Sequence, residues 1–150
     1  SQYRQFDFWL GEWQVTNTQN SNVSKSKISL INNGCTILEE YETPTGYQGK
    51  SLNIFDKTTN KWHQTWTDNS GLLLTLEGGF VDNKMVLIGK TQTNNDVTLH
   101  EISWQLLQDG RVNQRWKTSK DNGENWQELF SGFYEKHTHK SEGAETINAG

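Results

Sequence analysis

The sequence lacks several features that would place it in a familiar structural class. Its 150 residues include one cysteine and one proline. The lone cysteine, Cys35, excludes an intramolecular disulfide but leaves the redox compartment open. No stretch approaches the roughly 18 consecutive apolar residues of a transmembrane helix, so we expect no membrane span.

Positive charge is also scarce. Lysine and arginine number 14 against 18 aspartate and glutamate residues, and the formal net charge is −4. Nothing in the chain resembles the basic stripe that contacts phosphates, so nucleic acid is not an expected partner. The chain starts at Ser1 rather than at methionine, which leaves open a periplasmic or secreted location after signal removal.

Aromatic residues, in contrast, are abundant: seven Trp, six Phe and four Tyr. Each buried ring contributes a large apolar area, and the polar edge of Trp or Tyr needs a hydrogen-bond partner. A length of 150 residues is sufficient for one domain with a core of its own. We therefore expect a single domain in which a few large rings enclose a small space.

Strand and turn signals dominate, and helix signals are almost absent. Runs of β-branched and aromatic residues are interrupted at short intervals by Asn, Asp and Gly, which tolerate the backbone of tight reversals. The predicted reversals are 17–24, 32–34, 43–46, 56–60, 68–71, 82–83, 94–96, 109–110 and 121–123. Nine reversals give about ten strands, and consecutive hairpins without long crossovers indicate an all-β, antiparallel up-and-down barrel.

The two ends of the chain differ from its middle. From Tyr3 to Leu10 we predict a short helical turn whose apolar side chains close one end of the barrel. From His137 onward the sequence is polar apart from Ile147, which is typical of a loose tail. The predicted organisation is therefore a barrel over residues 1–136 and a polar C-terminal tail over 137–150.

The strongest motif is the string Phe-Asp-Phe-Trp-Leu-Gly-Glu-Trp at residues 6–13. It contains Gly11-Glu12-Trp13, the G-x-W pattern found on the first strand of lipocalin-type barrels. The chain resembles a bacterial family of small lipocalin-like barrels that begin with such a motif and have no established activity. Further matching stretches are 49–56, 61–68, 85–87, 109–114 and 119–126. The resemblance implies a lipocalin-like barrel.

A more distant resemblance is to nitrobindin-like barrels, which bind haem. Haem binding needs an inward axial histidine near an open apolar pocket, and only His100 has the required parity. The resembled lipocalin-like family has arginine at this position in many members, so a polar contact there is not carried over to His100. Haem binding is kept as an alternative, and no cofactor is predicted.

Alternation along the predicted strands brings polar residues onto inward faces beside tryptophan. Gln64 shares a face with Trp62 and Trp66, and Gln114 shares one with Trp116. Amides beside indoles are unusual in a filled core, because an unpaired buried amide costs roughly 1–3 kcal/mol. They suit a cavity that contacts both apolar surface and a few polar groups of a ligand.

We therefore predict that the interior binds a small, mainly hydrophobic molecule. The predicted ligand-binding residues are Asn53, Phe55, Gln64, Trp66, His100, Trp104, Gln114 and Trp116. Within this set the parity over 51–55 is ambiguous. The alternative is a filled barrel whose amides bond to each other or to buried water, and which acts through its surface or as a homodimer.

Catalysis is a competing interpretation. No nucleophile–base motif is present, and Cys35, at a strand start, is expected to be a small buried packing residue. One of Glu39 and Glu40 must point inward, where burial beside tryptophan would raise its pKa and suit it to acid–base work. The alternative function is an isomerase- or cyclase-like barrel enzyme that uses Glu40, His100 or Asp68.

Two further patterns are assigned no chemistry. His137 and His139 could face one side of a strand, but they lie near the tail without supporting ligands, so no metal is predicted. His63 shares a face with threonines and is expected outside. The stretch 119–126 fits the Asp-box hairpin, in which an aspartate accepts turn N–H groups and a tryptophan packs over the turn, and we expect a structural role.

Overall fold

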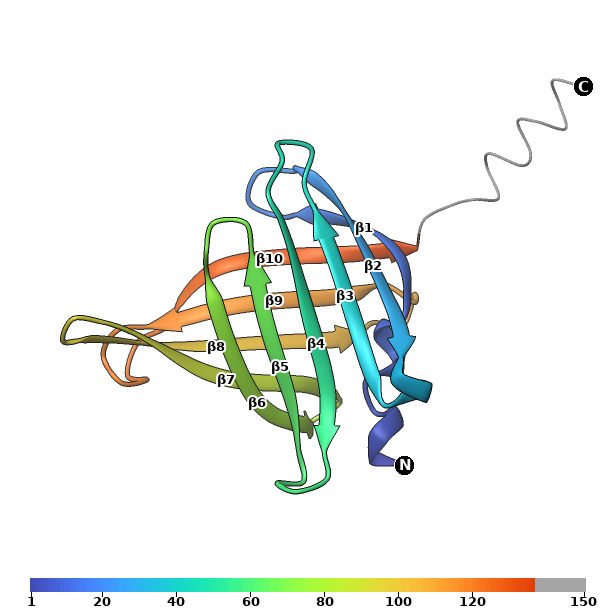
Figure 1. Cartoon of the computed structure of the whole chain (residues 1–150). Coiled ribbons are helices and arrows are strands. Elements are labelled where there is room, and N and C mark those ends of the chain that lie inside the picture. The colour runs from blue at the N-terminus through green and yellow to red at the C-terminus, as the bar shows by residue number, and fades with distance from the viewer. Residues whose placement is uncertain (137–150) are drawn as a thin grey trace, which may run out of the picture.

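Ten antiparallel strands form a closed barrel in the computed structural model of the chain (Figure 1). The structure describes residues 1–136, and the predicted tail, with its two histidines, lies outside the described residues. Strands follow one another around the barrel, and the last pairs with the first to close it. They are β1 (Gly11–Asn17), β2 (Val23–Ile31), β3 (Thr36–Glu42), β4 (Gln48–Asp56), β5 (Lys61–Asp68), β6 (Leu73–Val81), β7 (Lys84–Thr93), β8 (Asp96–Leu106), β9 (Val112–Ser119) and β10 (Gln127–Lys136). The predicted up-and-down fold is confirmed.

The turns between strands lie where Asn, Asp and Gly predicted them. Asn60, Asp82, Asn83, Asn94 and Asn122 all have φ between 50° and 65°. This left-handed backbone is costly for most residues, but Asn and Asp tolerate it. The turn signal in the sequence therefore has a direct cause in the backbone.

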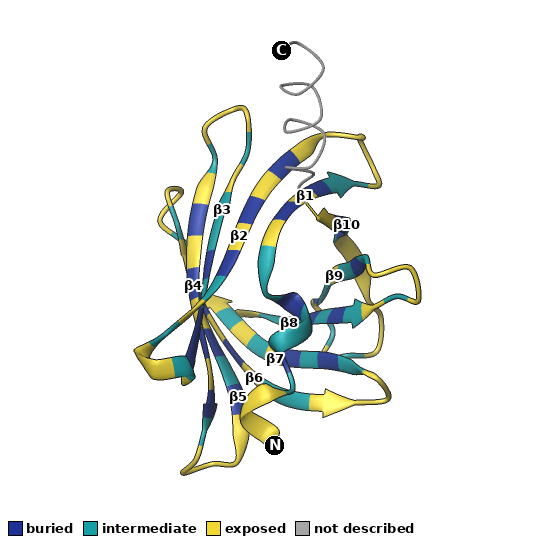
Figure 2. Ribbon diagram, turned by 90° about the vertical axis from the view of Figure 1, so that its right-hand side faces the viewer, coloured by how far each residue is buried: buried dark blue, intermediate teal, exposed yellow. Residues whose placement is uncertain are grey.

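Side chains alternate between the interior and solvent, which produces the banded strands of Figure 2. In β4 the side chains of Ser51, Asn53 and Phe55 are buried, whereas Leu52 and Ile54 between them are exposed. This alternation resolves the ambiguous parity of the strand. Asn53 and Phe55 both face the interior.

The N-terminal segment closes one end of the barrel, as predicted. A 3-10 turn, η2 (Asp7–Trp9), lies at that end. Phe6 and Trp9 are fully buried, and their rings stack with centroids 4.7 Å apart. Trp104 packs on Phe6 at 5.2 Å, and Trp13 donates from Nε1 to the Trp9 carbonyl at 2.8 Å. Aromatic rings thus fill this half of the interior, which we call the closed half.

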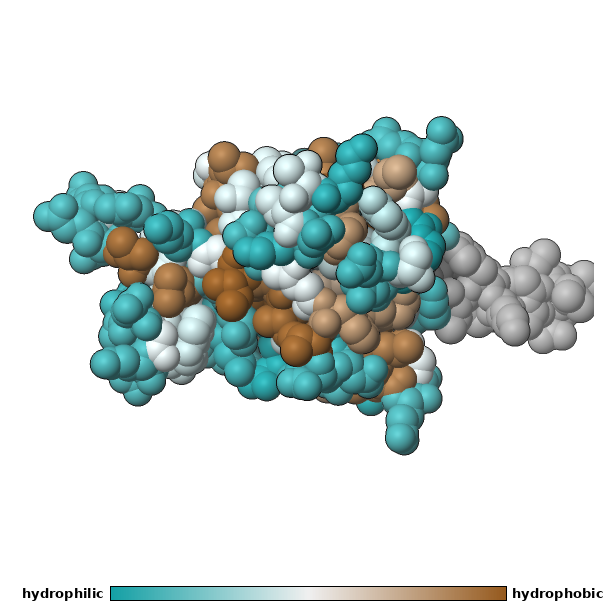
Figure 3. All heavy atoms as spheres, turned by 90° about the horizontal axis from the view of Figure 1, so that it is seen from below, coloured by the Kyte–Doolittle hydropathy of each residue, from teal (hydrophilic) through white to brown (hydrophobic). Residues whose placement is uncertain are grey.

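One expectation fails near the closed half. The 3-10 turns η1 (Gln2–Arg4) and η3 (Asn32–Gly34) are joined there by a hydrogen bond from Arg4 to the Gly34 carbonyl. Cys35 follows η3 and is exposed, not buried as expected, because the turn leaves it outside before β3 begins. Figure 3 views the molecule from below, where the N-terminus lies, and shows apolar residues gathered between polar ones.

Candidate functional site

The other half of the interior, here called the open half, contains a cavity of about 250 Å³. This is slightly below the roughly 300–1,000 Å³ typical of sites for drug-sized ligands, so it suits a smaller molecule. Strands β3, β5 and β6 line one side, and β8, β9 and β10 line the other. The lining residues, most of them apolar or aromatic, are Glu39, Tyr41, Tyr47, Gln64, Trp66, Leu74, Ile102, Gln114, Trp116, Leu129, Phe130 and Tyr134.

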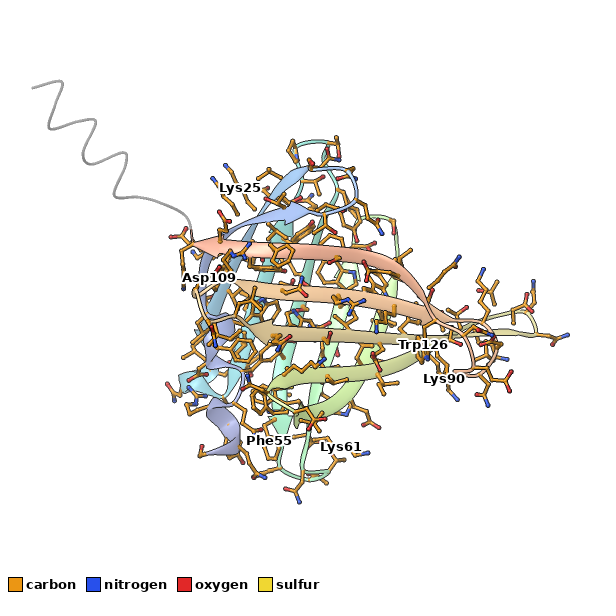
Figure 4. All side chains as sticks on the ribbon, turned by 180° about the vertical axis from the view of Figure 1, so that it is seen from behind. Lys25, Phe55, Lys61, Lys90, Asp109 and Trp126 are labelled. Atoms are coloured by element: carbon orange, nitrogen blue, oxygen red, sulfur yellow. The ribbon has the colours of Figure 1, made fainter. Side chains whose placement is uncertain are left out.

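The cavity mouth lies at the end of the barrel opposite the closed half. Tyr47 precedes β4, and Leu129, which is 53% exposed, lies near the start of β10. Figure 4 shows Trp126, just before β10, at the far end of the barrel from Asp109 in the β8–β9 turn. A β-bulge shifts the pairing of β10 with β9 and leaves Leu129 as the extra residue. Bulges of this kind re-aim side chains next to sites.

The structure places four of the eight predicted binding residues around the cavity and four elsewhere. Gln64, Trp66, Gln114 and Trp116 line it. The other four do not line the cavity. Asn53 lies behind Gln64 and His100 lies behind Trp116, each joined to it by a hydrogen bond. Phe55 and Trp104 lie in the closed half. The side chains of all four do face the interior, as their position in the strand alternation predicted. Parity alone could not show how far along the barrel the filled part extends.

Hydrogen bonds hold the two cavity tryptophans against the walls. Trp66 Nε1 donates to Asp68 Oδ2 at 3.2 Å, and Trp116 Nε1 donates to His100 Nδ1 at 3.0 Å. Each indole therefore has its polar edge satisfied at the wall and leaves its ring to border the cavity.

Glycines make room for two of the cavity rings. A Cβ added at Gly49 would overlap the Trp66 ring, and one added at Gly132 would overlap the Phe130 ring. Both rings therefore lie where a larger residue would push them away from the strand. The lack of a side chain at Gly49 and at Gly132 therefore helps to set the width of the cavity.

A chain of buried hydrogen bonds runs behind one wall of the cavity. The backbone carbonyl of Ile37 determines which atoms in this chain donate and which accept. Asn53 Nδ2 donates to the carbonyl of Ile37 at 3.2 Å and to Ser51 Oγ at 2.9 Å. Because a carbonyl can only accept, the Asn53 amide nitrogen must point that way. Asn53 Oδ1 then accepts from Gln64 Nε2 at 2.7 Å, and Ser51 Oγ donates to Glu39 Oε1 at 2.6 Å.

This chain fixes which polar atoms remain for the cavity. With Nε2 of Gln64 engaged, Oε1 of Gln64 remains as an acceptor. On the opposite wall Tyr134 donates to Gln114 Oε1 at 2.6 Å, so Nε2 of Gln114 remains as a donor. Among residues 1–136 neither of these two atoms has a hydrogen-bond partner.

Glu39 is the inward carboxyl group, and Glu40 is not. Glu39 is 4% exposed, and burial raises its pKa to about 7 despite the hydrogen bond from Ser51, which lowers it. Its Oε2 has no partner within the described part of the chain. Glu40 points outward, where its Oε2 lies 3.2 Å from Lys50 Nζ. Glu40, which the alternative enzyme interpretation named, therefore does not face the interior, and the inward carboxyl group is that of the preceding residue.

Asp68, a second candidate for acid–base chemistry, is saturated with donors. Its Oδ2 accepts from Tyr47 at 2.6 Å and from Trp66, and its Oδ1 accepts from the backbone and hydroxyl of Ser70. Burial alone would raise the pKa of Asp68, but these hydrogen bonds outweigh it and hold the pKa well below its usual range. Asp68 is a fixed anion that positions its neighbours.

His100 does not fit the haem alternative. Its Nδ1 accepts from Trp116, and its Nε2 lies 2.9 Å from Thr91 Oγ1. These contacts describe a neutral ring with its proton on Nε2, and burial lowers its pKa. An axial ligand needs a free nitrogen lone pair directed into an open pocket, and His100 has none.

The Asp-box hairpin forms the turn predicted for it beside the mouth. Asp121 Oδ1 accepts from Ser119 Oγ and from the Asn125 backbone, both at 2.8 Å. These hydrogen bonds, with one from the Asn125 side chain, lower the pKa of Asp121 to about 2. Trp126 closes the turn by donating to the Gly123 carbonyl. Each contact stays within the hairpin.

A second hollow, of about 360 Å³, lies among charged side chains of β1 to β4. Acidic and basic residues alternate across it, because Lys27 is paired in register with Glu12 and Glu40, and Glu40 with Lys50. Three carboxylates and three ammonium groups line it. The balance of charge gives it no preference for a ligand of either sign.

No family model and no curated protein sequence matches the chain, so the lipocalin-like resemblance stays a prediction. Within residues 1–136 no three His, Cys, Asp or Glu side chains are placed to hold a metal ion. No helix in that range is long and apolar enough to cross a membrane.

Proposed function

We propose that the barrel binds a small, mainly apolar molecule carrying a polar group, in the cavity of the open half. One observation supports this proposal above others. Three polar atoms of the cavity lining, Glu39 Oε2, Gln64 Oε1 and Gln114 Nε2, have no partner among the described residues. A filled core would leave such atoms unsatisfied at roughly 1–3 kcal/mol each, whereas a ligand or water in the cavity can bond to them.

The apolar part of the lining supports the same proposal. Leu74, Ile102 and Phe130 contact the cavity together with its two tryptophans. Binding sites for small molecules commonly combine apolar walls with a few oriented polar groups. The orientation here is preset, since the bonds behind Gln64 and Gln114 decide which amide atom faces the cavity.

A cavity-filling substitution tests the proposal with a matched control. The probe is 2-phenylethanol, titrated into the protein by calorimetry. Leu74→Trp places an indole in the cavity and should abolish saturable binding. Leu73→Trp adds the same group to the outward-facing neighbour, which is 60% exposed, and should leave binding intact. Circular dichroism checks that both variants fold. Absence of binding to the unmodified protein, or equal binding by both variants, would overturn the proposal.

One observation favours a second candidate, a proton transfer catalysed by Glu39. A carboxyl group with a pKa of about 7 in a cavity is suited to give and take a proton at neutral pH. Because Ser51 occupies Oε1, the proton resides on Oε2. The test is exchange of the α-protons of phenylacetone in D₂O, followed by NMR. The candidate is rejected if the unmodified protein exchanges them no faster than Glu39→Gln.

A further inference from the structure

The cavity lining contains an acidic side chain but no basic one. Its twelve lining residues include one carboxyl group, that of Glu39, and no Lys, Arg or His. A buried carboxylate normally has a cation or several donors beside it, because removing its charge from water is costly. Glu39 has one donor, Ser51, and a second oxygen without a partner within residues 1–136.

Aromatic rings surround the remaining space. Tyr41 lies edge-to-face with Tyr47 and with Trp66, each pair with centroids 6.3 Å apart. Trp116 and Phe130 are paired in register on the opposite side. The faces of such rings carry negative charge density and attract cations, most strongly where water is excluded. The rings and the carboxylate therefore favour the same sign of ligand charge.

We infer that the molecule held in the cavity is a small organic cation, an amine whose ammonium group pairs with Glu39 and whose apolar body lies between the aromatic walls. This inference rests on the proposed binding function and adds the chemical class of the ligand. An ammonium group has up to three N–H donors and no acceptor. Glu39 Oε2 and Gln64 Oε1, both free acceptors on the same side of the cavity, match two of them.

Within the described residues, no Lys, Arg or His side chain is paired with Glu39. The titratable groups that interact with Glu39 are the phenols of Tyr41 on β3 itself and of Tyr134 on β10, and the carboxyl group of Glu40 on β3 points outward to Lys50. The flanking strands β2 and β4 present Ile28 and Ser51 in register with Glu39, and neither side chain titrates. A ligand ammonium would therefore be the first positive charge to reach this carboxylate.

The test uses three probes of nearly equal size: 2-phenylethylamine, 2-phenylethanol and phenylacetate. At pH 8 the first is a cation, the second is neutral and the third is an anion. The amine should bind at least about tenfold more tightly than the alcohol, and phenylacetate should not bind measurably, because a desolvated charge pair favours the amine. With a Glu39 pKa of about 7, lowering the pH from 8 to 5.5 should weaken amine binding roughly 30-fold.

Neighbouring variants supply the control. Glu39→Gln keeps the size of the side chain and should remove both the amine preference and its pH dependence while 2-phenylethanol still binds. Glu40→Gln alters the outward-facing carboxyl group beside Lys50 and should change neither. Binding of the alcohol confirms that Glu39→Gln is folded with an intact cavity.

The outcomes separate this inference from the proposal beneath it. If 2-phenylethanol binds as tightly as the amine, or if the amine binds more tightly as the pH falls, the cation assignment is overturned while the binding cavity stands. If phenylacetate binds best, the cavity prefers an anion, and the assignment of a cationic ligand is wrong. If none of the three probes binds, the proposed function fails as well.

Discussion

The two halves of the barrel interior are both rich in aromatic rings, yet one is filled and the other is hollow. In the closed half, Trp9 Nε1 and Trp104 Nε1 are buried without hydrogen-bond partners among the described residues. In the open half, the indoles of Trp66 and Trp116 both donate to fixed acceptors. In the closed half the rings pack against one another, and Trp13 and Trp62 there also donate to an acceptor. In the open half both indoles that line the cavity are tied to the wall by hydrogen bonds.

The difference shows how a small barrel can keep an open space. Rings held only by packing fill whatever volume is available, because each contact adds dispersion energy. A ring tied by its N–H to Asp68 or His100 remains at the wall without neighbours on its cavity side. The hydrogen bonds of Trp66 and Trp116 therefore help to keep the cavity open, whereas the rings of the closed half pack against one another.

The largest contrast should appear on truncating one ring from each half. Trp104→Ala removes a fully buried ring from the closed half and should lower the free energy of unfolding by about 3–5 kcal/mol. Trp66→Ala should cost only about 1–2 kcal/mol, because its ring already has open space on one side. Urea denaturation of both variants measures this contrast. Equal losses would show that the open half is packed as tightly as the closed half.

Glu39 gives the open half of the interior a pH dependence. Its folded-state pKa of about 7 lies above the ordinary value of 4.5, so its contribution favours folding below pH 4.5 and is lost as the pH rises through 7. Glu39→Gln should therefore raise the free energy of unfolding at pH 8 by up to about 3 kcal/mol and change it little at pH 4.5. Urea titrations at the two pH values measure the difference.

Glu40→Gln is the control for that measurement. Its half-exposed pair with Lys50 should contribute less than about 1 kcal/mol. If Glu39→Gln behaves like Glu40→Gln, the carboxyl group of Glu39 is not buried as described.

The space beside Trp66 should respond to a single methyl group. Gly49→Ala places a Cβ against the Trp66 ring and should cost about 1–3 kcal/mol by overpacking while weakening 2-phenylethanol binding as the ring moves inward. Gly79→Ala is the matched control, because nothing lies within 4 Å of the added Cβ. If the two variants bind the probe equally well, Gly49 does not set the width of the cavity.

The smallest predicted effect comes from His100. Burial lowers its pKa, so its contribution to stability is present above the ordinary histidine pKa and is lost as the pH falls through the lowered value. Protonation of Nδ1 would also break the hydrogen bond from Trp116, worth about 1 kcal/mol. In a Glu39→Gln background, which removes the opposing trend, stability should fall between pH 7 and pH 5. Adding His100→Gln should flatten that fall.

Most of the fold could be predicted from the sequence because its signals are local. Asn and Asp at reversals such as Asp82-Asn83 adopt the left-handed backbone that few other residues tolerate. Alternation in β5 and β9 placed Gln64 and Gln114 inside. Cys35 was misplaced because the sequence does not show where η3 ends and β3 begins.

The site was harder to predict because it depends on contacts between distant strands. Parity required either Glu39 or Glu40 to face inward. The alternation itself favoured Glu39, which shares a face with Ile37 and Tyr41, whereas Glu40 shares a face with Glu42, but this signal was not used to choose between the two. Leu129 belongs to the lining because of a β-bulge, and no residue type in β10 predicts that bulge. The extent of the closed half depends on where the N-terminal rings lie, and Trp104 was therefore assigned to the cavity in error.

The most direct test of the contrast between the two halves is an NMR titration of methyl-labelled protein with 2-phenylethanol. Leu74 and Ile102 report on the cavity, and Met85 and Leu87 are fully buried core residues outside its lining. We predict saturable shifts of the Leu74 and Ile102 methyl signals with those of Met85 and Leu87 unchanged. Shifts of equal size in both pairs, or in neither pair, would contradict the presence of a binding cavity in the open half.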